Sequence, residues 1–391
     1  MRHIEELLEQ EVARGGIAGG NVICVQDGKE IFYHEAGYCD IERKLPIHRD
    51  TIFRLYSMSK PITSAAVMLL VERGELDLLT PVYEYLPGFA HQRYYDEYQL
   101  KNVAWPMNIK NLMSMTSGLV YPGEMTETEK DTKVIFDRLT DGLHEDNEFA
   151  SYGTVEAMND LGKMPLAFSP GAHWNYGASA DVLGAIIEVV SGMPFSEFLR
   201  KNLWEPLEMK DTGFYVPQEK QIRLARSYEA TADGLKEYTG DHLAIRNRME
   251  KAPAFESGGA GMCSTIDDYM NFNQMLMNKG IYKGRKIMSE KTIDFMTSGQ
   301  LTQEQQKTFN WDSLEGYSYG NLLRVMKWPE NGTHLSTYGE YGWDGWLGAY
   351  MMNVPKEKLS FILMYQKKDA GTTSFTRRMK NVLYSTLKNG E

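Results

Sequence analysis

The sequence predicts an α/β (α+β) fold in which strands from both ends of the chain form one antiparallel sheet, flanked by helices and interrupted by a mainly helical insertion. Strand-like patterns lie near the N-terminus, helical patches joined by long loops fill the middle, and strand-like patterns return near the C-terminus. We therefore expect a discontinuous α/β domain of residues 1–75 and 255–391 and an insertion domain of residues 76–254.

The N-terminal region combines helical and strand patterns. Apolar residues at helical spacing predict a helix over residues 2–14. Residues 21–26 and 30–35 are strand-like and flank an Asp-Gly turn, which predicts a β-hairpin. A third short strand is expected over residues 51–55, followed by a helical run over residues 57–73 that ends at a glycine.

Two helices in the remainder of the chain have clear boundary signals. Residues 179–191 carry an apolar face and end at Gly192, and residues 266–278 follow a Ser-Thr cap and end near Gly280. The other expected elements are strands over residues 318–325, 348–353 and 359–365 and a final helix over residues 373–387.

The composition is that of a folded globular protein with an acidic balance. Hydrophobic residues make up 42% of the 391 residues, which is enough apolar material to exclude disorder as the dominant state. The formal net charge is −11, from 42 basic and 53 acidic residues. An acidic chain argues against nucleic acid or an anionic membrane as a partner, since both attract basic surfaces.

Cysteine and histidine usage predict neither disulfides nor a metal site. The three cysteines, Cys24, Cys39 and Cys263, are far apart and form no CxxC pair, and the eight histidines form no HExxH pair. The first residues form an amphipathic pattern rather than a signal-peptide run, and no stretch of 18 residues is uninterruptedly apolar. We therefore expect a cytoplasmic protein with no metal and no cofactor; the sequence leaves the oligomeric state open.

The first candidate for chemistry is the pair Ser57 and Lys60, which form an SxxK motif at the start of a predicted helix. Spacing i, i+3 places both side chains on one helical face. Lysine can activate a serine only if its pKa falls from about 10.4 to near 7, and burial at the positive end of a helix acts in that direction. The SxxK motif alone is weak evidence for a catalytic pair, because a helix-capping serine followed by a surface lysine has the same pattern.

Three further segments have both a functional and a packing interpretation. Tyr176 lies in a loop before a helix, where it is either a general base or a buried aromatic anchor. The glycine-rich segment 257–261 lacks the GK[ST] of a phosphate loop, so close packing is the better interpretation. Residues 341–348 place small residues among tryptophans before a strand, which suits either a strand edge that a ligand approaches or a tight turn. The absence of GxSxG disfavours an α/β-hydrolase.

Taken in order, these segments resemble the serine β-lactamase and penicillin-binding-protein superfamily, and within it the class C β-lactamase-related carboxylesterases of the family VIII type. The resemblance covers nearly the whole chain. The segments that carry it are Phe53-Arg54-Leu55-Tyr56-Ser57-Met58-Ser59-Lys60, Leu112 to Leu119, Phe168-Ser169-Pro170-Gly171, Tyr176 with Asp181 to Gly184, Ser257 to Gly261 with Ser264 to Tyr269, and the Trp343 segment.

The resemblance implies a β-lactamase/transpeptidase-like fold with the active site between an α/β domain and a helical insertion. By position, Ser57 looks like the acylated nucleophile, Lys60 its base partner and Tyr176 the second base. The backbone amides of Ser57 and Trp346 look like the two oxyanion donors. Trp343, Asp344 and Gly345 stand where lactamases carry Lys-Thr-Gly, and these three residues are implied to contact substrate.

Two departures from the lactamase pattern favour esters as substrates. Tyr-x-Asn is here Tyr176-Gly177-Ala178, and the lysine of Lys-Thr-Gly is Trp343, so the cation that would pair with a β-lactam carboxylate is missing. Asp344 adds negative charge at this point. We expect a serine hydrolase that cleaves uncharged small-molecule esters or amides through an acyl-enzyme. The alternatives are a β-lactamase, D-aminopeptidase or acyltransferase on the same fold, and a non-catalytic sensor.

Overall fold

The computed structural model describes residues 1–97, 99–144 and 147–387. Its centre is one eight-stranded sheet with the order β12-β13-β14-β15-β16-β1-β2-β3, in which every neighbouring pair is antiparallel. The strands are β1 (Gly19–Gln26), β2 (Lys29–Asp40), β3 (Leu45–Pro46), β12 (Tyr317–Gly320), β13 (Leu323–Met326), β14 (Tyr341–Asp344), β15 (Tyr350–Val354) and β16 (Leu359–Tyr365).

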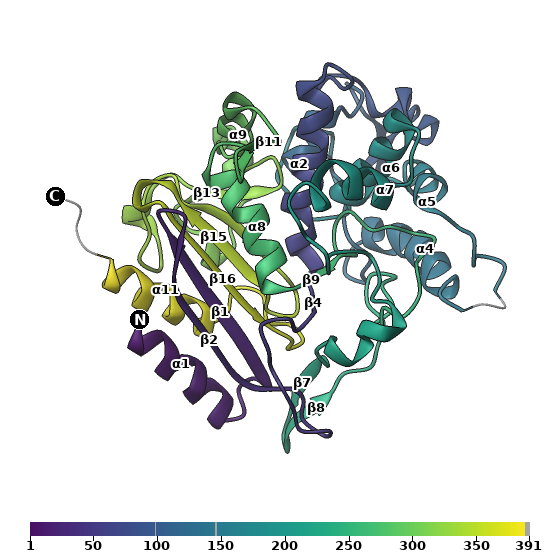
Figure 1. Ribbon diagram of the computed structural model, residues 1–391. Coiled ribbons are helices and arrows are strands. Elements are labelled where there is room, and N and C mark those ends of the chain that lie inside the picture. Colours follow the sequence, from purple (N-terminus) through teal and green to yellow (C-terminus); the bar gives the residue numbers. More distant parts are fainter. Residues whose placement is uncertain (98, 145–146, 388–391) are drawn as a thin grey trace.

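The two ends of the chain meet in the middle of this sheet. Strand β1 pairs with β2 on one side and with β16 on the other, so Ile23 lies opposite both Tyr33 and Ile362. Figure 1 shows the N-terminal strands in purple beside the yellow-green C-terminal ones. The prediction of one antiparallel sheet built from both chain ends is therefore confirmed, while the domain boundaries at residues 75 and 255 stay a prediction.

Helices cover both faces of the sheet. One face packs against α1 (Arg2–Ala13) and α11 (Ser374–Thr386) through a core that contains Leu8, Val22, Phe361 and Met379. The other face packs against α2 (Ser59–Glu72) and α8 (Ile266–Met277) in the larger core. Because successive side chains of a strand point to opposite faces, the central strands β1, β15 and β16 contribute alternate residues to the two cores.

The remaining elements lie mainly between α2 and α8 in the sequence. The helices are α3 (Ile109–Met113), α4 (Glu127–Asp141), α5 (Thr154–Leu161), α6 (Ser179–Ser191), α7 (Phe195–Leu199), α9 (Glu290–Met296) and α10 (Gln303–Gln306). Short strand pairs are β4 (Phe53–Arg54) with β9 (Cys263–Ser264), β5 (Arg93–Asp96) with β6 (Gln99–Asn102), β7 (Tyr228–Thr231) with β8 (Gly234–Glu237), and β10 (Ile281–Tyr282) with β11 (Arg285–Lys286).

Most predicted elements are confirmed, and three differ. The expected strand over residues 318–325 is two strands, because Asn321 and Leu322 both adopt positive φ and reverse the chain between β12 and β13. The expected strand over residues 51–55 is the two-residue β4, which pairs with β9 outside the main sheet. Trp343 lies within β14 rather than before a strand.

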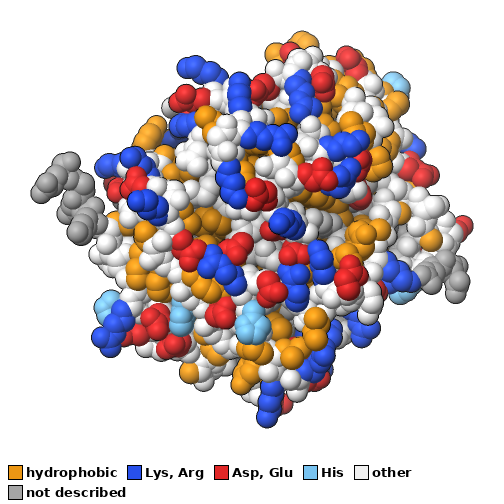
Figure 2. Space-filling view, in the orientation of Figure 1, with side chains coloured by type: hydrophobic (Ala, Val, Ile, Leu, Met, Phe, Trp, Pro, Cys, Tyr) orange, Lys and Arg blue, Asp and Glu red, His pale blue; other side chains and the backbone are white. Residues whose placement is uncertain are grey.

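Charged side chains of both signs are interspersed on the face of the molecule that Figure 2 shows. Among the described residues, no single helix is long and apolar enough to cross a membrane. The helices Ser179–Ser191 and Phe195–Trp204 meet the length and composition criteria only as a joined pair, and they are bent by 77°.

A fully buried ion pair ties α11 to the sheet. The Lys380 ammonium donates to a carboxylate oxygen of Glu340 at 2.6 Å, and both residues are at most 1% exposed. The Tyr317 and Tyr384 hydroxyls donate to the same carboxylate, each at 2.6 Å. These hydrogen bonds satisfy charges that would otherwise be costly to remove from water.

Replacing one member of this pair should destabilise the protein strongly. Lys380→Met leaves the Glu340 carboxylate buried without a cation, a situation that typically costs about 3–5 kcal/mol in unfolding free energy. Urea denaturation followed by fluorescence measures the loss. Lys133→Met is the matched control, because its 2.6 Å pair with Asp137 is exposed and should contribute much less. Equal losses in the two variants would show that burial of the pair is irrelevant.

Candidate active site

The segment that carries Ser57 is held firmly while the serine itself stays accessible. Strand β4 leads into a 3₁₀ turn, Tyr56–Met58, and then into α2. Within residues 51–60 every side chain is buried except Ser57. The Tyr269 hydroxyl of α8 donates to the Met58 carbonyl at 2.8 Å. Tyr56 has a φ of 44°, a left-handed conformation that is unusual for a bulky residue and often marks a functional site.

Lys60 is fully buried directly below Ser57. Its ammonium lies 3.1 Å from the Ser57 hydroxyl oxygen, 2.9 Å from the Tyr121 hydroxyl and 2.8 Å from the Gly259 carbonyl oxygen. No carboxylate in the described parts of the chain forms an ion pair with it. Burial lowers the Lys60 pKa to about 7, although the charges of Asp181 and Asp344 oppose this shift.

A lysine with this pKa suits a general base. Near neutral pH a large fraction of the amine is uncharged, and a neutral amine has one lone pair and two N–H bonds. The Gly259 carbonyl and the Tyr121 hydroxyl accept the two N–H bonds, which directs the lone pair toward the Ser57 proton. The geometry therefore brings Ser57 and Lys60 together as the sequence predicts.

Tyr176 lies in the loop before α6, as expected, and joins the same cluster. Its ring centroid is 4.6 Å from the Lys60 nitrogen, and its hydroxyl accepts a hydrogen bond of 3.0 Å from the Trp343 indole. Burial raises the Tyr176 pKa, and hydrogen bonds with Ser57 and Trp343 only partly oppose the rise. The nearby Lys60 therefore does not lower the pKa of Tyr176 below its ordinary value. The hydroxyl is protonated at neutral pH and suits proton donation.

Trp343 and Asp344 at the end of β14, and Gly345 directly after it, differ in orientation and burial. Trp343 is 1% exposed and points toward Tyr176. Asp344 points to the opposite face, because strand side chains alternate, and its carboxylate accepts a hydrogen bond from Thr372. A Cβ on Gly345 would lie 2.1 Å from the Leu55 carbonyl oxygen. The small residue admits the chain's own backbone at this point, and contact of Trp343, Asp344 and Gly345 with substrate stays a prediction.

The close approach of Gly345 to the Leu55 carbonyl also positions the expected oxyanion donors. The Trp346 ring lies 4.9 Å from the Tyr56 ring, which places residue 346 beside the turn that contains Ser57. The Trp346 ring stacks on His242 at 4.0 Å, and its indole donates to Asp369 at 2.7 Å. Among the described residues the Trp346 amide has no hydrogen-bond acceptor. The Ser57 amide lies in the first turn of its helix, where amides have no intrahelical acceptor.

Two side chains of the cluster were not predicted. Tyr121 accepts a hydrogen bond from Lys60, and Asp181 accepts hydrogen bonds from the Ser257 hydroxyl and the Gly259 amide, at 2.5 and 3.0 Å. A Cβ on Gly259 would lie 2.7 Å from the Tyr121 oxygen and 2.8 Å from an Asp181 oxygen. The packing interpretation of segment 257–261 is therefore confirmed. No local pattern around Tyr121 indicates its role, since the loop is placed by tertiary contacts.

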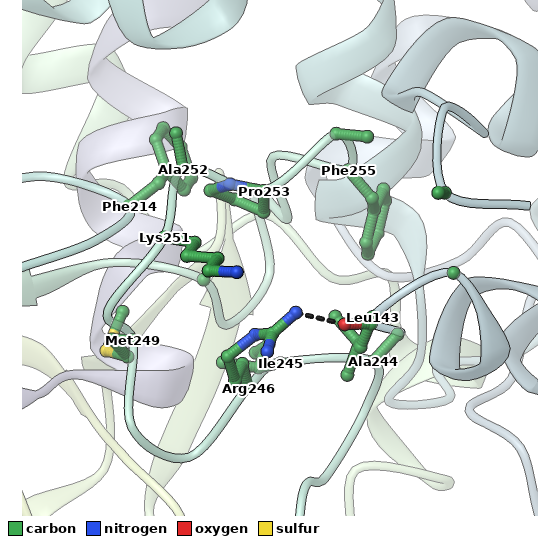
Figure 3. A pocket seen from close by; sticks show the side chains of 14 residues that line it. Leu143, Phe214, Ala244, Ile245, Arg246, Met249, Lys251, Ala252, Pro253 and Phe255 are labelled. Atoms are coloured by element: carbon green, nitrogen blue, oxygen red, sulfur yellow. Dashed lines mark hydrogen bonds between the residues drawn. The ribbon is translucent and has the colours of Figure 1, made fainter. Parts of the chain in front are cut away.

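A cavity of about 210 Å³ is lined in part by Gly261 at the end of segment 257–261. Figure 3 shows Ile245, Phe255 and Lys251 in its wall, with the Arg246 guanidinium donating to the Leu143 carbonyl. Ile245 belongs to one apolar cluster with Tyr56 and Leu347. The cavity therefore shares the wall residue Ile245 with the cluster that contains Tyr56.

The chain matches the beta-lactamase family model over residues 4–383. It belongs to the beta-lactamase family. Esterase EstB of Burkholderia gladioli is 30% identical over 283 residues, which is 68% of this chain and 67% of that protein. Protein Rv1367c of Mycobacterium tuberculosis (strain ATCC 25618 / H37Rv) is 30% identical over 355 residues, 87% of this chain and 83% of that protein.

Among solved structures, EstCE1, a hydrolase with promiscuous acyltransferase activity, superposes with a TM-score of 0.80 and 25% identity, covering 98% of each chain. The family and these relatives show that this chain is an enzyme of the serine hydrolase superfamily, with esterase and acyltransferase homologues. The predicted fold and the resemblance to β-lactamase-related esterases are confirmed.

The pKa of Lys60 predicts the pH dependence of activity. Protonated Lys60 cannot accept the Ser57 proton, so kcat/KM should rise with pH through about 7 and then level off. Ester hydrolysis measured from about pH 5 to pH 9 gives the profile. Lys60→Arg, which keeps a charge but removes the base, should lose roughly 10²–10⁴-fold in activity. A flat profile across neutral pH would contradict the assignment of Lys60.

The Trp343 indole should matter through its hydrogen bond to Tyr176. Trp343→Phe removes the donor, and we expect kcat to fall roughly tenfold, the equivalent of one lost hydrogen bond. Trp204→Phe is the matched control, since Trp204 is also buried, its indole nitrogen has no partner within the described residues, and its ring packs against Phe214. In a Tyr176→Phe background the Trp343 change should add little. A full further loss there would show a role independent of Tyr176.

Proposed function

We propose that this enzyme is a serine carboxylesterase that hydrolyses small uncharged esters through an acyl-enzyme on Ser57. The observation that carries the proposal is the buried Lys60 amine, which lies 3.1 Å from the Ser57 oxygen with a pKa of about 7. A serine hydroxyl is a weak nucleophile, and an adjacent uncharged amine provides the base that it requires.

The first half-reaction acylates the serine. Lys60 accepts the Ser57 proton while the serine oxygen attacks the ester carbonyl. The negative oxygen of the tetrahedral intermediate accepts hydrogen bonds from the Ser57 and Trp346 amides. When the bond between carbon and the alcohol oxygen breaks, Tyr176 donates a proton to the alcohol, and the proton on Lys60 replaces it. The net change transfers the acyl group to Ser57 and releases a neutral alcohol.

The second half-reaction regenerates the enzyme. Water attacks the acyl carbon at the position that the alcohol has left, and its proton passes to the Tyr176 and Lys60 pair. The intermediate collapses, the Ser57 oxygen leaves, and a proton returns to it from Lys60. The products are the carboxylic acid and free enzyme, so protons and electrons balance without a cofactor.

The surroundings of Tyr176 support esters over β-lactams. The position of the lactamase lysine is Trp343, so no cation stands there to pair with a substrate carboxylate. EstB, one of the relatives, is an esterase, which agrees with this preference. Asp344 lies on the opposite face of β14, and its charge still acts on Lys60. The absence of nucleic-acid and membrane partners and the cytoplasmic location stay predictions.

An acyltransferase is the second candidate function, favoured by the similarity to EstCE1. Its chemistry shares the acyl-enzyme and differs only in the acceptor, which is an alcohol or amine in place of water. Addition of such an acceptor to the ester assay would distinguish the two, because a transferase forms the new ester or amide faster than it forms acid.

Ser57→Ala should abolish turnover of p-nitrophenyl esters and prevent labelling by a fluorophosphonate, because the nucleophilic oxygen is gone. Ser59→Ala is the matched control, since this neighbouring hydroxyl is buried and accepts a hydrogen bond from the Met262 amide. Intact mass measured after labelling locates the adduct. Full activity in Ser57→Ala would overturn the proposal.

A comparison of substrates should distinguish a carboxylesterase from a β-lactamase. The hydrolysis rate of nitrocefin should lie well below that of the best ester in a panel of increasing acyl length, because the substrate carboxylate finds no cation at Trp343. A nitrocefin rate equal to the best ester rate would instead favour a β-lactamase.

A further inference from the structure

Trp311 presents an exposed aromatic ring directly beside Tyr176. Their ring centroids lie 5.2 Å apart in an edge-to-face arrangement, and the Trp311 side chain is 42% exposed. By contrast Trp343, on the β14 side of Tyr176, is 1% exposed and offers no free face. Of these two indoles, only Trp311 can meet a molecule that arrives from solvent.

The exposed ring is supported from below by buried aromatic side chains. The Trp311 ring lies 5.4 Å from the ring of Trp174, which in turn lies 4.6 Å from Phe309 and 5.6 Å from Tyr319. The Trp174 amide donates to the Thr308 hydroxyl at 2.8 Å, which joins the Trp311 segment to the loop that carries Tyr176. Trp311 is therefore held in place relative to Tyr176.

The chemistry of the proposed reaction places the leaving alcohol on this side. Tyr176 protonates the alcohol oxygen, so that oxygen must lie within hydrogen-bond distance of the Tyr176 hydroxyl. The group attached to the oxygen extends away from Ser57, past the Tyr176 ring. The acyl group lies on the other side of the scissile bond, so it does not compete for this surface.

We propose that Trp311 is a substrate-binding residue for the leaving alcohol and that it selects esters of flat aromatic alcohols. Aromatic rings gain from edge-to-face or offset stacking beyond simple burial, whereas an alkyl alcohol of similar size gains only contact area. The inference rests on the proposed esterase function and names the alcohol part of its substrates.

The test compares esters that share one acyl group. Phenyl acetate, cyclohexyl acetate and ethyl acetate form the same acetyl-enzyme, so differences in kcat/KM report on the alcohol alone. In Trp311→Ala, kcat/KM for phenyl acetate should fall about tenfold relative to wild type, and that for ethyl acetate less than about twofold. Since deacylation involves no alcohol, its rate in single-turnover experiments should be unchanged.

Three further variants keep the test decisive. Trp311→Phe retains a ring and should keep most of the preference, whereas Trp311→Leu retains bulk without a flat ring and should lose it. Trp328→Ala removes a tryptophan that is also 42% exposed but has no ring contact with Tyr176 or Trp174. It should leave all three rates unchanged.

The possible failures are distinguishable. Equal losses for phenyl, cyclohexyl and ethyl acetate in a folded Trp311→Ala protein would overturn the role of Trp311 in selecting aromatic alcohols. An unchanged phenyl acetate rate in both Trp311→Ala and Trp311→Leu would overturn it as well. A wild-type enzyme that hydrolyses none of the three esters would instead contradict the esterase function itself.

Discussion

The dry environment of the Lys60 amine is the constraint on which the rest of the site depends. A buried ammonium without a carboxylate partner is costly, and the protein responds by favouring the uncharged form. That response needs an acceptor for each amine N–H and exclusion of water. Tyr121 and the Gly259 carbonyl provide the acceptors, and the packed side chains around residues 57–60 exclude the water.

Several otherwise unrelated features of the chain follow from this requirement. Segment 257–261 must approach α2 closely enough for a carbonyl to reach the amine, which explains why Gly258 and Gly259 have no room for a side chain. Asp181 holds the same segment through the Ser257 hydroxyl and the Gly259 amide. The left-handed Tyr56 turns the chain so that Ser57 remains accessible above a lysine that is not.

The tryptophans around Ser57 are of two kinds, one buried and the others more exposed. Trp343 is buried and acts inward, through its hydrogen bond to Tyr176. Trp311 and Trp346 are more exposed and lie on different segments of the chain. On the resemblance to lactamases, an indole that is a neutral hydrogen-bond donor stands at Trp343 in place of a cation.

By itself the sequence determined five of the helices, the hairpin, the sheet built from both chain ends, and the pairing of Ser57 with Lys60. These features depend on local periodicity, on turn residues and on spacing within one helix. Only the tertiary structure decided that Tyr121, Asp181 and Trp311 join the site, because the loops that carry them are placed by long-range contacts. It also decided that Asp344 points away from Ser57, since the face occupied by each side chain of a strand depends on the register with its neighbours. The lowered pKa of Lys60 was also decided by the tertiary structure, because burial is a property of the folded chain and has no local signature.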